Sequence, residues 1–389
     1  MYDKWQLNRN PFYTRPIEQL TIADFAAREK ELETLNSFSK DDGVIVLIGD
    51  PGVGSTSIAN YSRFSNKAAV TPRYEFKMEH ISTGLDMLKT LIYGLATEIT
   101  KCKLRSKHAK AVLKNFSINP LDLSIGINAL GLGVNMKGGK GLPENPMALM
   151  DVFNSLVLDI IEGSKKKLLI FQLNNMNIHS PEAQDRIHTV LDQMRDVFQT
   201  PQTLWYLLGD SALERTIKDK IPRLSSIVKT WLLLSPINAE GFGAIYEKRI
   251  KNSGKNAIAP FTKEGVSQLC LAAHGRIRYA FDIASALIQK YADTIYPETI
   301  DVPLIKKEAD EKIAAIVGKD NFSPKAKEIL YYIVSHPGIG SGELSKGVSI
   351  STGNLTKFVN PLIEANLVEK IVNGRVVNHY PIGLAHLLK

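Results

Sequence analysis

Two features that are scarce in this sequence limit its class: cysteines and long apolar runs. Cys102 and Cys270 are the only cysteines among 389 residues, and their wide spacing indicates neither a disulfide framework nor a metal site. No run of 18 apolar residues occurs, so we expect no membrane span and no membrane partner. The first residues, MYDKWQLNRNPF, are polar and lack the apolar stretch of a signal peptide. These absences predict a cytoplasmic protein.

Apolar residues and positive charge, in contrast, are plentiful. Hydrophobic residues make up 44% of the chain, enough to bury a large core, and the length allows two or three domains. The formal net charge is +8. A basic balance favours an acidic partner such as nucleic acid.

Apolar strands alternate with helical segments over the first 236 residues. We predict strands at 43–49, 167–173, 203–209 and within 225–236. Helices are predicted over 23–38, 55–66, 83–115, 146–162 and 181–198. Buried strands that alternate with helices are typical of a three-layer α/β sandwich around a largely parallel sheet.

The chain divides into four predicted units. They are an α/β core (1–236) with a lead-in (1–42), an all-helical unit (237–293), a connector (294–321) and a small carboxy-terminal unit (322–389). Within the core, residues 121–137 alternate with period two around a glycine-containing turn, which predicts an inserted hairpin. This hairpin is either an extra edge of the sheet or a finger that touches DNA or another subunit.

The stretch VLIGDPGVGSTSIAN (46–60) has the form of a phosphate-binding loop. The usual pattern is G-x-x-x-x-G-K-[ST], and here Ser55 stands in place of the lysine. Glycines let backbone N–H groups converge on phosphate oxygens, and the following helix contributes its dipole. Thr56 is placed to hold a magnesium ion. The predicted nucleotide-binding residues are Gly49, Asp50, Pro51, Gly52, Val53, Gly54, Ser55, Thr56 and Ser57.

The charged groups that split a nucleoside triphosphate are missing from this pattern. Ser55 removes the cation that reaches the terminal phosphates. Asn174 and Asn175 stand at the end of the strand LLIFQL, where acidic residues are expected, and a neutral amide cannot act as a general base. We therefore predict that ATP or ADP with magnesium binds and that hydrolysis is very slow or absent. The alternative is that the acidic positions of this strand are assigned in the wrong register and that another acidic residue, such as Asp50, supplies the missing charge.

The carboxy-terminal unit has the pattern of a winged helix. Ser323-Pro324 opens a first helix, a second follows at 342–348, and Ser351 caps a third, in which Pro361 should cause a kink or an early end. The segment LVEKIVNGRVVNHYPI predicts a strand, an Asn-Gly turn and a second strand. In such folds the third helix enters the DNA major groove. The predicted DNA contacts are Ser351, Thr352, Asn354, Thr356, Lys357, Asn373, Gly374 and Arg375. The alternative is a winged helix that binds protein.

A second basic stretch, residues 101–114, has six Lys or Arg and no acidic residue. It is either a phosphate-binding helix face or solvated surface.

The order of these motifs resembles the AAA+ ATPases, in particular the archaeal origin-recognition initiators and related winged-helix signal-transduction ATPases. Asn10-Pro11-Phe12 and the box Arg28–Leu32 are similar to the family's entry to its core, and GDPGVGST and IFQLNNMN resemble its two Walker motifs in degenerate form. LWYLLGD stands where the family has its first sensor, with Gly209 and Asp210 in place of the usual polar residue. The resemblance implies an AAA+ core, a helical lid over 237–293 and a winged helix.

The resemblance also implies two arginine roles. Gly275 and Arg278 have the Gly-x-x-Arg spacing of the second sensor, which places Arg278 over the phosphates. Arg223 precedes the last core strand, where the family has an arginine finger that acts on a neighbouring subunit.

Three functions are compatible with these patterns. The first is a DNA-binding AAA+ protein with a degenerate nucleotide site, in replication initiation or a mobile-element process. It would self-associate or work with a partner ATPase or a nuclease- or transposase-type protein. The second is a signal-transduction switch in regulation or defence, whose winged helix binds a protein or promoter DNA. The third is an active ATPase with a displaced catalytic set.

Overall fold

The computed structural model describes residues 2–72, 76–78, 81–115, 145–176, 178, 181–318, 322–365, 367–373, 376–382, 385 and 388. The predicted hairpin at 121–137 lies outside these residues. Among the helices of the described part, none has the length and apolar composition that a membrane span requires.

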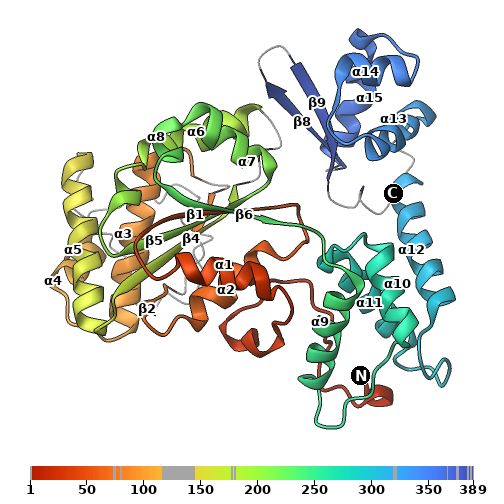
Figure 1. Cartoon of the computed structure of the whole chain (residues 1–389), viewed down its shortest axis with the longest axis horizontal. Helices are drawn as coiled ribbons and strands as arrows, with labels where there is room; N and C mark the ends of the chain where they lie inside the picture. The colour runs from red at the N-terminus through yellow and green to blue at the C-terminus, as the bar shows by residue number, and fades with distance from the viewer. Residues whose placement is uncertain are drawn as a thin grey trace.

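A parallel sheet forms the centre of the first unit (Figure 1). Its strands run in the order β2-β4-β5-β1-β6, and β3 pairs with β4. They are β1 (Gly43–Gly49), β2 (Ala69–Val70), β3 (Phe76–Lys77), β4 (Leu168–Met176), β5 (Thr203–Gly209) and β6 (Val228–Leu234). Because all pairings are parallel, the carboxyl ends of β1, β4 and β5 meet at one edge. The predicted α/β class is confirmed.

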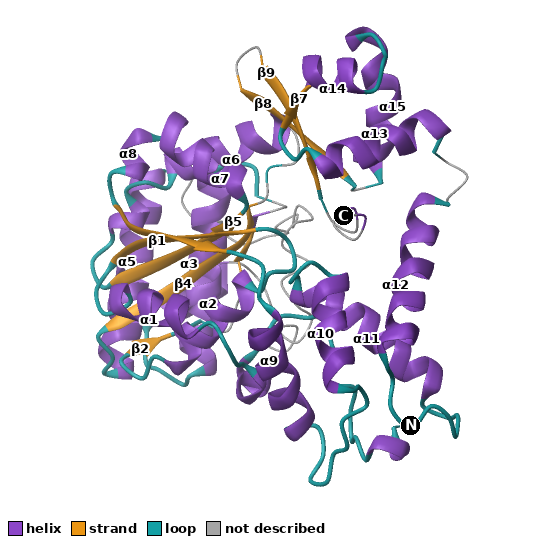
Figure 2. Cartoon of the chain, turned by 45° about the vertical axis from the view of Figure 1, so that its right-hand side comes forward, coloured by secondary structure: helices purple, strands orange, loops and turns teal. Residues whose placement is uncertain are grey.

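Helices cover both faces of this sheet, as Figure 2 shows. On one face lie α1 (Glu29–Phe38) and α2 (Ser55–Ser65), which pack on Ile45 and Leu47 through Leu35 and Ile58. On the other face lie α3 (Gly84–Lys101), α4 (Lys107–Asn115), α5 (Pro146–Ser164), α6 (Pro181–Gln193), α7 (Ser211–Arg215) and α8 (Pro222–Ser225). These two apolar clusters make the three layers.

The lead-in differs from the prediction of one helix over 23–38. Residues Gln19–Asp24 form a 3₁₀ helix, and α1 begins only at Glu29. Ala27 and Arg28 between them have φ values of 61° and 71°. The left-handed region interrupts an α-helix. It also lets the Arg28 guanidinium donate to the carbonyls of Val53 and Ser235, at 3.0 and 2.6 Å.

A helical lid follows the core. It consists of α9 (Ala239–Lys251), α10 (Lys263–Ala272) and α11 (Ile277–Tyr291), and α12 (Val302–Val317) continues into the connector. The start of the chain packs on this lid and not on the sheet, because Trp5 and Phe12 are buried in the lid's apolar cluster. The lead-in therefore joins the lid to the core from below (Figure 1).

The carboxy-terminal unit contains α13 (Pro324–Ser335), β7 (Ile339–Gly340), α14 (Ser341–Gly347), α15 (Thr352–Glu364), β8 (Val368–Asn373) and β9 (Val376–Pro381). The three strands are antiparallel in the order β7-β9-β8. Three helices with this small sheet form a winged helix, as predicted. Pro361 lies inside α15, which continues to Glu364, so of the two predicted effects an end of the helix at Pro361 is not seen. Ser351 occupies the N-cap, but its side chain makes no capping hydrogen bond.

The winged helix rests against the core. Ile371 of β8 is buried in the core's apolar cluster, and Tyr380 of β9 packs against it. The Arg215 guanidinium of α7 lies 5.5 Å from the centre of the Tyr380 ring. The strand pair is thus attached to the core on the side where α7 follows β5.

Substitution of Phe12 tests whether its packing attaches the lead-in to the lid. Its ring is fully buried against Tyr246, Phe261 and Phe281, at centroid distances of 5.8, 5.5 and 5.8 Å. We expect Phe12→Ala to lower the free energy of unfolding by about 3–5 kcal/mol, the usual cost of such a cavity. The control Phe38→Ala, at a ring that is 39% exposed, should cost about 1 kcal/mol or less. Urea unfolding followed by fluorescence measures both, and equal losses would contradict the packing role of Phe12.

Candidate nucleotide-binding site

The phosphate loop connects β1 to α2 and has the backbone of an anion-binding turn. Gly52 and Gly54 have φ values of 94° and 102°, in the left-handed region that glycine tolerates best. Gly54 is the N-cap of α2, which begins at Ser55. The first N–H groups of a helix have no partner within it, so they are available to an anion in front of the loop.

A pocket opens in front of this loop, between the core, the lead-in and the lid. All nine predicted loop residues, from Gly49 to Ser57, line it. Arg278 of α11 and Asn175 at the end of β4 line it as well, as predicted site residues. The other walls come from the lead-in (13–17 and 24–26), Leu208 and Gly209 of β5, and Ile245, Arg249 and Phe281 of the lid. Segments far apart in sequence therefore meet around one cavity.

Ser55, which stands in place of the usual lysine, has a buried hydroxyl that could serve a phosphate ligand. Its hydroxyl oxygen is buried and has no hydrogen-bond partner in the described part of the chain. A Cβ added at Gly49 would lie 2.5 Å from this oxygen, so only glycine fits beneath it. A buried hydroxyl without a partner is costly unless a ligand satisfies it. A phosphate oxygen would accept its hydrogen bond once the Ser55 side chain turned from Gly49 toward the cavity.

The lid is fastened to the phosphate loop by two contacts. The backbone N–H of Arg278 donates to the carbonyl of Gly52 at 3.1 Å. The Arg276 guanidinium, 7% exposed, forms an ion pair with Asp50 at 2.9 Å. Gly275 precedes them with φ 71°, and a Cβ there would lie 2.3 Å from the carbonyl of Ile237. The start of α11 thus has one close-packed position over the loop.

The acidic groups expected at the carboxyl end of β4 are replaced by amides that the strand uses itself. Asn174 is buried, and its Oδ1 accepts a hydrogen bond from Gln172 Nε2 at 2.9 Å. Asn175 has φ 60°, and the pairing of β4 with β5 slips between Leu173 and Met176. This distortion turns Asn175 toward the pocket, which it lines, without providing a base.

Carboxylates near the phosphate loop are occupied by arginines. Among the described residues that line the pocket, the carboxylates are those of Asp24 and Asp50. Asp50 pairs with Arg276, and Asp24 pairs with Arg9 at 2.8 Å. The alternative in which Asp50 replaces the missing acid therefore requires its ion pair to open.

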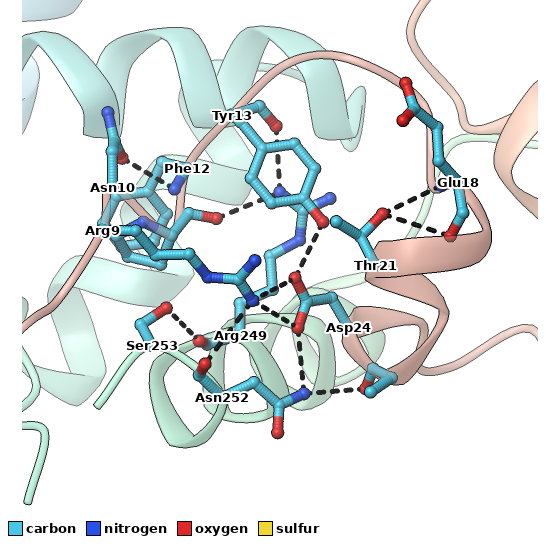
Figure 3. Close-up of polar contacts among 12 residues, drawn as sticks. Arg9, Asn10, Phe12, Tyr13, Glu18, Thr21, Asp24, Arg249, Asn252 and Ser253 are labelled. Atoms are coloured by element: carbon cyan, nitrogen blue, oxygen red, sulfur yellow. Dashed lines mark hydrogen bonds and ion pairs between the residues drawn. The ribbon is translucent and has the colours of Figure 1, made fainter. Parts of the chain in front are cut away.

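A buried polar cluster joins the lead-in to the lid beside the pocket (Figure 3). Asp24, 2% exposed, lies in its middle and accepts hydrogen bonds from Arg9 Nη2, Tyr13 Oη and Asn252 Nδ2, at 2.8, 2.8 and 2.9 Å. Burial raises the pKa of the Tyr13 hydroxyl, so it remains a donor at neutral pH. The sequence patterns did not identify this cluster, because its residues come from segments more than 200 positions apart.

Arg249 completes this cluster as a buried cation in the wall of the pocket. Its guanidinium lies 4.1 Å from the Tyr13 ring centre and 4.2 Å from that of Phe281, and Nη1 donates to the carbonyls of Pro11 and Tyr13. Burial lowers the pKa of Arg249 to about 10, so it stays charged at neutral pH. With Arg278, it gives the pocket positive charge that does not come from the loop, whereas Arg28 is paired with Glu31 at 2.7 Å.

Two residues predicted to act on the nucleotide do not line this pocket. They are Asp210, at the first-sensor position, and Arg223, the predicted arginine finger. Asp210 is buried and caps α7 by accepting from the N–H groups of Ala212 and Leu213, at 3.0 and 3.1 Å. Gly209 lines the pocket with its backbone. Arg223 is exposed on α8 and does not line the pocket.

Five of the predicted DNA-contacting residues lie at the N-cap and in the first half of α15. Ser351, Thr352, Asn354, Thr356 and Lys357 are all exposed. Thr352 and Thr356 line a hollow between α15 and β9, together with Lys370 of β8. Asn373 ends β8, and Gly374 and Arg375 lie outside the described residues.

Solved structures of three archaeal proteins have the same architecture. The ORC1 protein of Aeropyrum pernix, solved in complex with DNA, is 15% identical with a TM-score of 0.50, over 98% of this chain and 97% of that chain. The Walker-type ATPase paby2304 of Pyrococcus abyssi is 14% identical with a TM-score of 0.53, over 97% and 99%. The ORC2 protein of A. pernix in its ADP form is 14% identical with a TM-score of 0.52, over 98% and 96%.

No protein-family model and no curated sequence matches the chain. The structural likeness nevertheless extends over nearly the whole chain, from the phosphate-loop core to the winged helix. The chain shares the fold of these origin-recognition and Walker-type ATPase structures, which confirms the fold that the motifs implied.

Substitution of Asp24 tests whether the polar cluster in the pocket wall stabilises the fold. Asp24→Asn keeps the size of the side chain but removes the charge that Arg9 and its neighbours face. We expect a loss of about 1.5–3 kcal/mol in the free energy of unfolding, the usual value for hydrogen bonds to a charged group. The control Asp293→Asn changes an exposed carboxylate and should leave the urea midpoint unchanged. A midpoint that is equally insensitive to Asp24→Asn would contradict the role of the cluster.

Proposed function

We propose that this chain is a DNA-binding AAA+ protein that binds ATP or ADP and hydrolyses ATP very slowly or not at all. The observation that carries the proposal is the chemistry of the pocket. It has a phosphate loop and several arginines, but no lysine in the loop and no carboxylate outside an ion pair among its described residues. Such a site binds a nucleotide and lacks a base for the attacking water.

Phosphate binding would rest on neutral donors of the core and a cation of the lid. The N–H groups at the start of α2 and the Ser55 hydroxyl would contact the phosphate oxygens. Arg278 would approach from the lid, so a bound nucleotide would tie α11 to the core in addition to the Asp50–Arg276 pair. Magnesium, when bound, would neutralise phosphate charge, and the Thr56 hydroxyl is the residue placed to hold it.

The winged helix supports the DNA-binding part of the proposal. It presents the exposed side chains of Thr352, Asn354 and Lys357 along α15, and the similar ORC1 protein was solved in complex with DNA. We place the protein in replication initiation or a mobile-element process in the cytoplasm. This proposal includes a partner. The partner is a second copy of the chain, contacted through the exposed Arg223, or a partner ATPase, or a nuclease- or transposase-type protein.

The second candidate function is a nucleotide-dependent switch in regulation or defence. Its support is the packing of Ile371 and Tyr380 against the core, which would let the nucleotide state affect the position of a winged helix that binds protein or promoter DNA. Duplex DNA affinity that is the same with and without bound nucleotide would favour the first function, because a switch requires the nucleotide state to affect the winged helix.

Nucleotide titrations test the pocket. We expect fluorescent ADP to bind the unmodified protein and Arg278→Ala to weaken that binding about 10- to 100-fold, the effect of one charge-assisted hydrogen bond. The control Arg223→Ala should leave the affinity of a monomer unchanged. Phosphate release should stay near background with magnesium, with or without DNA. Rapid metal-dependent phosphate release would refute the proposal and favour a displaced catalytic set.

Salt-dependent DNA titrations test the wing. Lys357→Glu with Arg375→Glu should weaken duplex binding at least about tenfold and reduce its dependence on salt, because two phosphate contacts are lost. Lys306→Glu with Lys307→Glu is the matched control, since both lysines are exposed on the connector helix α12. Equal affinity of the two double variants would show that the wing is not the DNA reader.

A further inference from the structure

A second basic surface lies at the amino-terminal edge of the core sheet. It is made by residues 101–114, which run from the end of α3 through α4, by Lys165–Lys167 between α5 and β4, and by Lys67 before β2. The Lys167 N–H donates to the carbonyl of Ala68 at 3.0 Å, and Lys166 Nζ donates to that of Lys67 at 2.6 Å. A Cβ added at Gly163 would lie 3.3 Å from the Leu104 side chain. The three segments are therefore neighbours, and we call them the edge surface.

The edge surface accounts for all of the excess positive charge of the chain. It contains Lys67, Lys101, Lys103, Arg105, Lys107, Lys110, Lys114, Lys165, Lys166 and Lys167, and no acidic residue. The whole chain has 48 Lys and Arg against 40 Asp and Glu. Without these ten cations the balance is 38 against 40, so the rest of the protein taken together is slightly acidic, although residues 322–389 have 7 Lys and Arg against 4 Glu.

These cations are directed outward. All ten residues are exposed. Lys107, Lys110 and Lys114 recur at helical spacing on α4, while Ala109 and Val112 are buried beneath them. Asp159 of the adjoining α5 is occupied by Ser106 and His108, at 2.5 and 2.9 Å. The carboxylates beside the surface include Asp159 and the exposed Glu162 of α5 and the buried Glu98 of α3, and the ten cations outnumber these three.

We propose that the edge surface binds the phosphate backbone of duplex DNA, independently of base sequence. Protein interfaces are enriched in aromatic residues and depleted of lysine, whereas this surface has nine lysines, one arginine and no aromatic residue. Lysine contacts to phosphates supply affinity and salt dependence without reading bases. The inference rests on the proposed DNA binding and adds a second contact region to it.

This region is separate from the wing and from the nucleotide pocket. The edge surface lies at the start of β4, while the pocket lies at its end, and a nine-residue strand spans roughly 25–30 Å. Figure 1 has α3, α4 and α5 at the opposite side of the core from the lid and the winged helix. A duplex held here is thus either a second segment or DNA that is bent around the core.

The experiment measures binding of a random-sequence duplex as a function of salt. The test variant is Lys103→Gln, Arg105→Gln, Lys107→Gln and Lys165→Gln combined. The control variant is Lys248→Gln, Lys251→Gln, Lys255→Gln and Lys263→Gln, which removes the same charge from exposed positions of the lid. We expect the test variant to bind about tenfold more weakly and to lower the slope of log K against log salt by about 2 or more, since each lost contact contributes about 0.9.

The outcomes separate this inference from the proposed function. If the unmodified protein does not bind duplex DNA at low salt, the proposed function fails. If it binds, and the test and control variants behave alike, the edge surface is not a DNA contact and only this inference is overturned. Competition by polyglutamate as effective as that by DNA of equal charge would also overturn it, because the partner would then be any acidic polymer. Unchanged melting temperatures of both variants exclude unfolding as the cause.

Discussion

The clamp between the phosphate loop and the start of α11 is the constraint on which the rest of this structure depends. The loop contributes glycines at φ 94° and 102°, and the lid contributes Gly275 at φ 71° and an ion pair from Arg276 to Asp50. These backbone positions allow two pieces of chain more than 200 residues apart to approach closely. The pocket exists only because the lid is held there, since Arg249, Arg278 and Phe281 form its second wall.

The loop has no lysine, and the cations that line the pocket are arginines of the lead-in and the lid. In the usual phosphate loop the lysine acts from within the loop itself. Here Ser55 leaves a buried hydroxyl, and the cations come from the lead-in and the lid. In the proposed function, a bound nucleotide would hold the lid against the loop. Among the described residues of the pocket, both carboxylates are in ion pairs, so neither is free to act as a base.

Charge is also distributed unevenly over the surface of the molecule. Positive charge collects at the amino-terminal edge of the sheet, and the wing contributes only a few cations. The winged helix offers polar side chains that suit recognition of bases, and the edge surface offers lysines that suit phosphates. The two surfaces lie on opposite sides of the core (Figure 1), which itself contains the nucleotide pocket.

Short-range patterns along the chain were sufficient to predict the local features. Strand β5 has the predicted bounds 203–209, and the glycine pattern located the loop, because short-range periodicity and glycine spacing act within a few residues. Tertiary structure alone decided the break before Glu29, where Arg28 is drawn to Val53 and Ser235. It also decided that Phe12 joins the lid, that Asp50 is paired with Arg276, and that Lys67, Arg105 and Lys165 share one edge. These outcomes depend on contacts between distant segments, which no local pattern specifies.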